Sequence, residues 1–166
     1  PPFDDVEEGP FPRQRRGPIF TMDQDFIANW KPRTLKLSDA ATNFADSLRA
    51  RSKDLLKSQM LMVESGHIIR DRMQKAEIPL EDEDRLFAAE AVYQQACVYA
   101  ETKHIEYAIE ALEVATSLGF NDVNRLRSRF NSPEYTGQDR FEALVKHIEL
   151  DYEKELDFRI EIALES

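Results

Sequence analysis

Hydrophobic residues recur at helical spacing through most of the chain after position 37. Between Ser38 and Ala76 an apolar residue returns every seven positions, which is typical of a helix that buries one face. Ser38 is a favourable N-cap, and Pro79 cannot continue a helix. The pattern therefore predicts one long helix over about residues 38–76. Its apolar stripe comprises Ala41, Leu48, Leu55, Met62, Ile69 and Ala76.

Small or polar residues interrupt this stripe. Ser52, Gln59 and Gly66 lie between the apolar positions. Residues of this kind either admit a close neighbouring helix or leave the seam poorly packed. Because the second seam position is seldom apolar, the pattern favours a helix pair within the chain over a coiled-coil dimer.

The next apolar pattern predicts two helices joined by a short turn. Acidic residues at 82–84 suit the first turn of a helix that continues to about Thr102, and the turn lies at Lys103 and His104. The second helix should end at Leu118, because Gly119 suits the left-handed position that follows a helix. So short a connection requires an antiparallel hairpin. The face of its second helix that we expect to be buried is Ile105, Ala108, Ile109, Leu112 and Ala115.

A last helix is predicted from about Gln138 to Leu164, with apolar residues at helical spacing along its whole length. This length exceeds what a single hairpin can cover. Its C-terminal half is therefore a candidate contact surface. The other faces are strongly acidic, and the alternative is that these charges are simply solvated.

Residues 1–36 have a different pattern and are expected to form an extended arm. Six prolines disfavour helix formation there, yet aromatic residues and arginines are interleaved with them. Such a segment is suited to lying in a groove of a partner protein, with packing on its own helices as the alternative. The candidate partner-binding residues of this docking arm are Phe11, Arg13, Arg15, Arg16, Phe20, Phe26 and Trp30.

Composition limits the kinds of partner. The 166 residues carry a formal net charge of −10, which disfavours nucleic-acid binding because phosphate recognition needs clustered Lys and Arg. No apolar run is long enough to span a bilayer, so membrane contact is expected to be at most peripheral. Cys97 is the only cysteine and excludes an internal disulfide. A soluble protein of a reducing compartment, such as the cytoplasm or an organelle matrix, fits this composition.

The hairpin resembles a tetratricopeptide repeat. Its small and large signature positions correspond to Ala96, Tyr99, Ala108, Leu112 and Ala115, although Gln95 stands where that motif prefers Leu. The following Gly119-Phe-Asn turn and the later Asp139-Arg-Phe-Glu-Ala-Leu-Val segment are similar to the part that closes many bacterial-type repeat proteins. The resemblance implies a helical hairpin with a capping helix and a binding role. No second copy of the motif precedes it, so the long helix 38–76 is expected to cover the hairpin.

Two Glu-x-x-His motifs suggest a different class of protein. Glu64 with His67 and Glu101 with His104 have the spacing by which helical bundles hold a pair of metal ions. This alternative requires the four side chains to converge. Five glycines, none of them in a phosphate-binding loop, and a cysteine in an apolar context leave no other catalytic candidate.

These patterns predict an all-α protein with an arm over 1–36 and a helical domain over 37–166. The domain should be an antiparallel, tetratricopeptide-like hairpin packed on a long N-terminal helix and capped by a C-terminal helix. The function expected is non-catalytic protein–protein interaction, as an accessory or scaffolding subunit of a larger assembly, without a cofactor. Partner proteins would contact the arm and the helical faces. A related possibility is an adaptor that binds peptides in a groove lined by Tyr93 and Tyr107.

Overall fold

The computed structural model describes residues 37–75 and 80–165, and these form seven helices and no strand. The predicted all-α class is therefore confirmed. The seven residues of the predicted docking arm, from Phe11 to Trp30, lie outside the described part. The helices are α2 (Ser38–Ala50), α3 (Leu55–Lys75), α4 (Asp82–Glu101), α5 (Ile105–Ser117), α6 (Val123–Arg129), α7 (Pro133–Thr136) and α8 (Asp139–Glu165).

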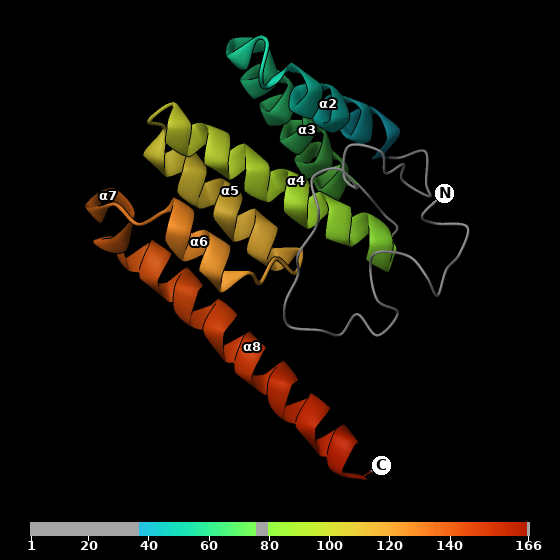
Figure 1. Cartoon of the computed structure of the whole chain (residues 1–166), viewed down its shortest axis with the longest axis vertical. Helices are drawn as coiled ribbons and strands as arrows, with labels where there is room; N and C mark the ends of the chain where they lie inside the picture. Colours follow the sequence, from blue (N-terminus) through green and yellow to red (C-terminus); the bar gives the residue numbers. More distant parts are fainter. Residues whose placement is uncertain (1–36, 76–79, 166) are drawn as a thin grey trace. The chain divides into compact units, whose positions relative to one another are not determined.

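The described helices fall into two compact units. The first unit, residues 37–120, contains α2 to α5. Within it α2 packs on α3, α3 on α4, and α4 on α5. Figure 1 shows α2 beside α3 and α4 beside α5, so two helical hairpins follow one another along the chain. The second unit contains α6, α7 and α8.

The prediction of one long helix over residues 38–76 is wrong, because the chain reverses direction between α2 and α3. The break occupies Arg51 to Asp54, and the Asp54 carboxylate accepts a hydrogen bond of 3.1 Å from the backbone N–H of Lys57 at the start of α3. Asp54 is thus a favourable N-cap for the new helix. The seven-residue period of apolar residues continues across the turn through Leu55. This residue is 53% exposed, however, so the period does not indicate burial at this position.

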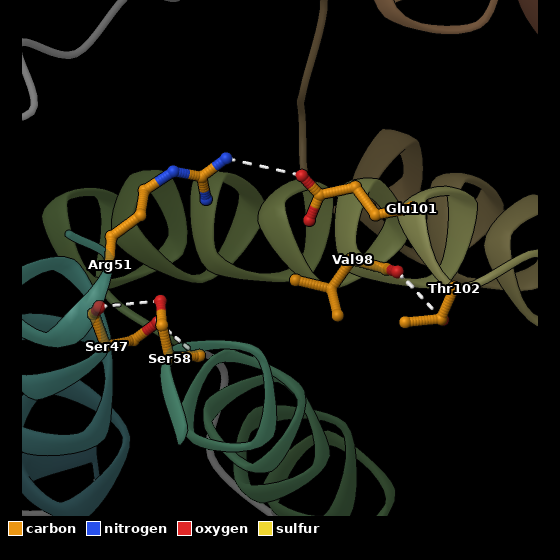
Figure 2. A network of polar contacts seen from close by, with 6 residues as sticks. All are labelled: Ser47, Arg51, Ser58, Val98, Glu101 and Thr102. Carbon is orange, nitrogen blue, oxygen red and sulfur yellow. Dashed lines mark hydrogen bonds and ion pairs between the residues drawn. The ribbon is translucent and has the colours of Figure 1, made fainter. Parts of the chain in front are cut away.

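Serine side chains join α2 to α3. Ser47 Oγ donates a hydrogen bond to the Ser58 carbonyl at 2.5 Å, and Ser58 Oγ donates to the Ser47 carbonyl at 2.7 Å (Figure 2). Further along, Ser65 Oγ donates to the Ala40 carbonyl at 2.8 Å. All three serines are buried. Side chains this small allow the two helices to approach closely, and their hydroxyls are satisfied by the opposite backbone.

Gly66 and Gln95 define the contact between α3 and α4. Gln95 is fully buried, and its Nε2 donates a hydrogen bond of 2.9 Å to the Val63 carbonyl. A Cβ atom at Gly66 would lie 2.7 Å from that Nε2, so the side-chain amide occupies the space that the glycine leaves. Of the two readings of the interrupted stripe, the structure therefore supports close approach of a neighbouring helix at Gly66.

The second hairpin has the short connection that the sequence predicts. Lys103 adopts φ 65° in the turn, and Thr102 Oγ1 donates a hydrogen bond of 2.9 Å to the Val98 carbonyl (Figure 2). At the other end of α5, Gly119 has φ 106°, as expected for the residue that follows a helix. The Phe120 N–H then bonds the Ala115 carbonyl at 3.0 Å, and the Phe120 ring is buried.

The core of the first unit centres on α4. This helix contacts both α3 and α5 and buries residues around most of its circumference, including Phe87, Val92 and Cys97. Cys97 is only 2% exposed and is a small core residue, as its apolar context suggests. At the tip of the first hairpin, Arg51 makes an ion pair of 3.3 Å with Glu101 near the end of α4 (Figure 2).

The second unit is built on the first half of α8. Three aromatic rings pack together there, with centroid distances of 5.1 Å between Phe130 and Tyr135 and 6.0 Å between Tyr135 and Phe141. An ion pair of 2.8 Å joins Arg127 of α6 to Glu149 of α8. The buried residues of α8 are Phe141, Leu144, Val145 and Ile148, whereas every described residue from 156 onward is exposed. Only the first part of this helix contributes to a core.

Candidate functional site

Rings from three helices and one turn of the first unit gather on one surface. His67 lies on α3, Tyr99 on α4, His104 in the turn, and Tyr107 on α5. The ring centroids are 5.5 Å apart for Tyr99 and Tyr107 and 6.0 Å apart for His104 and Tyr107. These four residues are called the ring patch below.

Local hydrogen bonds fix the positions of these rings. The Tyr99 hydroxyl lies 3.2 Å from His67 Nε2 and so connects α4 to α3. His104 is held in the turn by its backbone N–H, which donates to the Tyr99 carbonyl at 2.8 Å, and by its Nδ1, 2.9 Å from Thr102 Oγ1. The patch is thus ordered by the helix connection itself.

Three of the four rings of the ring patch are exposed to solvent, and charged residues lie beside it. Tyr107 is 57% exposed, both histidines are exposed, and Tyr99 is half-buried. Arg70 of α3 makes an ion pair of 2.7 Å with Glu110 of α5 beside the patch. Burial raises the pKa of Tyr99 above its usual value; Arg70 opposes this effect, while Tyr107 and Glu110 reinforce it. The Tyr99 hydroxyl is therefore neutral at physiological pH and available for hydrogen bonding.

The residues assigned to repeat packing lie in and beside the second hairpin core. Ala96, Ala108, Leu112 and Ala115 are each at most 1% exposed. Alanines at such positions let α4 and α5 approach closely. Tyr99 differs from the others, because its ring extends into the ring patch and is only half-buried.

The four residues of the metal alternative do not converge. His67 faces the Tyr99 hydroxyl, His104 faces Thr102, and the Glu101 carboxylate pairs with Arg51. Within residues 37–75 and 80–165, no group of three or more His, Cys, Asp or Glu side chains is placed to hold a metal ion. The geometric requirement of the metalloprotein alternative is not met, because His67, Glu101 and His104 each contact a different residue.

The possibility of a peptide groove lined by Tyr93 and Tyr107 is not supported, because the two rings do not share an open surface. Tyr93 is only 1% exposed, and its ring stacks on Phe120 with a centroid distance of 4.2 Å. Tyr93 is therefore a core residue, because α4 is packed on several sides and this ring points inward. Tyr107 alone of the two lies at the surface.

Every member of the ring patch is a candidate residue in the sequence, but the predicted roles are separate. The patterns indicate repeat packing for Tyr99, a metal site as an alternative for the two histidines, and a possible peptide groove for Tyr107. The short turn between α4 and α5 was a usable signal, because it must bring Tyr99 and Tyr107 close together. Placing His67 with them required the register of α3 on α4, and no residue pattern specifies that register.

Comparison with protein-family models, with curated proteins and with solved structures finds no match to this chain. Among the described helices, none combines the length and the apolar character that crossing a membrane requires. The ring patch therefore has to be interpreted from its own chemistry.

Proposed function

We propose that this protein is a non-catalytic protein–protein interaction module, acting as an accessory or scaffolding subunit of a larger assembly. The observation that carries the proposal is the ring patch. Four amphipathic rings from three helices and a turn present π-faces and polar atoms to solvent on one surface. Tyrosines in particular supply large contact area at low entropic cost, and they are enriched at the centres of protein interfaces.

The exposure of Tyr107 supports a binding role for the patch. Its side chain contacts other rings but leaves more than half of its surface in water. The hairpin core beneath is closed by Ile109 and Leu112, which are buried. Since the core is complete without the outer face of Tyr107, that face is available to a partner.

The arrangement of helices also supports this proposal. Two successive hairpins, α2 with α3 and α4 with α5, resemble the way in which tetratricopeptide and related repeats present helical faces to partners. The docking arm remains part of the proposal, with Phe11, Phe20, Phe26 and Trp30 as its aromatic anchors. In this view a partner protein contacts both the arm and the helical surface.

The test is the native mass of the assembly that forms around the full chain in its source cells. Tyr107→Ser and His104→Ser together should release the chain from a defined assembly, because they remove the two stacked rings of the patch. Leu56→Ser is the matched control, since Leu56 is 67% exposed and is separated from His67, the ring-patch residue on the same helix, by eleven positions or about three turns of α3. Circular dichroism melting checks that all variants are folded.

A wild-type chain that runs as a monomer in native extracts would contradict the proposed role. If the assembly forms unchanged with the doubly substituted chain, the ring patch is not part of the binding interface.

A further inference from the structure

The C-terminal half of α8 carries an apolar face that the described part of its own unit does not cover. Leu156, Ile160 and Leu164 are 41%, 50% and 81% exposed, and Ala163 is exposed beside them. These four residues, called the α8 stripe, are spaced i, i+4, i+7 and i+8. Residues at this spacing share one face of a helix.

The described helices of the second unit do not bury this stripe. Within the described part of that unit, α8 packs on α6 and α7, and the last buried residue of α8 is Ile148. The chain nevertheless continues as helix to Glu165. Exposed apolar residues that recur at helical spacing beyond the end of a core are typical of a helix that packs against another protein.

The charged residues next to the stripe indicate which kind of partner it can bind. Asp157 and Glu161 lie along one edge of it and Arg159 along the other, and residues 149–165 contain seven acidic residues against two basic ones, Lys154 and Arg159. Two such helices side by side would place acidic residues against each other, which disfavours a second copy as the occupant. An anionic membrane surface is disfavoured for the same reason.

We propose that the α8 stripe binds a basic amphipathic helix of another protein. Apolar side chains of that helix pack between Leu156, Ile160 and Leu164, in the manner of ridges and grooves between helices. Its Lys and Arg residues lie opposite Asp157 and Glu161. This inference concerns a different surface from the ring patch and stands independently of it.

The test uses the full chain and a designed probe. The probe is a fluorescein-labelled peptide of about 18 residues, or five helical turns, with Leu on one face and Lys and Arg on the others. A second peptide keeps the Leu face and replaces the basic residues with Glu. Fluorescence anisotropy should show binding of the basic peptide and at least about tenfold weaker binding of the acidic one, which corresponds to ~1.4 kcal/mol.

Variants of the chain separate specific docking from general attraction to an acidic protein. Leu156→Ser with Ile160→Ser leaves the charge unchanged and should weaken binding of the basic peptide at least about tenfold. Leu150→Ser is the matched control: Leu150 is 54% exposed, and at 3.6 residues per turn it lies on a different face from Leu156. This control should bind like the wild type.

Three results would overturn the inference. The first is equal binding of the basic peptide to the wild type and to the double variant, which would indicate charge attraction alone. The second is equal binding of both peptides. The third is a wild-type dimer in light scattering that the double variant abolishes, which would make a second copy the occupant. The native mass measured with the Tyr107 and His104 substitutions is unaffected by these outcomes.

Discussion

Gln95 illustrates how one side chain determines the distance between two helices. Its amide enters the space left open at Gly66 and donates to the Val63 carbonyl, while its Oε1 is buried and has no hydrogen-bond partner among the described residues. At this position a tetratricopeptide-like motif prefers Leu. The polar residue here gives the contact between α3 and α4 a directional bond, at the cost of one unsatisfied acceptor.

Gly66→Ala should destabilise the protein by about 1 kcal/mol. The alanine gains about 1 kcal/mol of helix propensity but displaces the Gln95 amide, whose lost hydrogen bond costs ~1–3 kcal/mol. In a Gln95→Ala background the obstacle is gone, and the same substitution should stabilise by roughly 0.5–1 kcal/mol. Urea unfolding of the wild type, the two single variants and the double variant measures this change of sign. Equal stabilisation in both backgrounds would show that the Gln95 side chain moves aside without lowering the free energy of unfolding.

In the sequence, Gly66 is an interruption of the apolar stripe that is compatible with either a close neighbouring helix or a poorly packed seam. A glycine in a helix is informative only when the residue facing it is known. Gln95, 29 positions away, was noted for departing from a motif and not as a partner. Pairing the two required the register between α3 and α4, which is a property of the folded state.

At the scale of elements, the least predictable feature is the reversal between α2 and α3. The seven-residue period runs through residues 51–54 without a change, so periodicity alone favours a continuous helix. Asp54 was the missed signal, because it is a good N-cap next to Ser52 and Lys53 in a segment without large apolar residues. The serines that join the two helices have no apolar signature. The hairpin α4–α5, in contrast, was predictable because Gly119 and a short polar turn mark its boundaries.

A pair of cysteines at positions 47 and 58 distinguishes a hairpin from a continuous helix. The two serine Oγ atoms are 3.2 Å apart, so Ser47→Cys with Ser58→Cys should form a disulfide readily. In a continuous helix the two positions would be about 16 Å apart along the axis. The experiment uses a Cys97→Ala background and measures the intact mass after mild oxidation.

The single-cysteine variants control for bonds between molecules. A double variant that stays reduced, or that forms only disulfide-linked dimers, would contradict the hairpin.

At the scale of the whole molecule, the buried cores are distinct from the two surfaces that we propose as binding sites. The buried residues of α8 end at Ile148, and those of the first unit centre on α4. The ring patch and the α8 stripe lie outside these cores. The all-α class, the second hairpin and the exposed end of α8 could be predicted from apolar periodicity, since this pattern reports burial. The composition of the ring patch could not, because polar and aromatic surface residues have no period that links three helices.

Removal of residues 156–166 should change the free energy of unfolding by less than about 0.5 kcal/mol, because no described residue in that segment is buried. Ile148→Ala should instead cost ~2–4 kcal/mol, since Ile148 is 1% exposed. Chemical denaturation followed by circular dichroism compares the two variants. A large loss of stability on truncation would mean that the end of α8 contributes to the core.

The burial of Cys97 has a practical consequence for measuring motion. A thiol reagent reaches this side chain only when the core around α4 opens, because 98% of its surface is covered in the closed state. The rate of labelling, divided by that of a free thiol peptide, therefore gives the equilibrium constant for opening. Since the chain has one cysteine, this readout needs no engineered label and reports on a single location. A partner that engages the neighbouring ring patch would slow the labelling by the factor by which it stabilises the closed state.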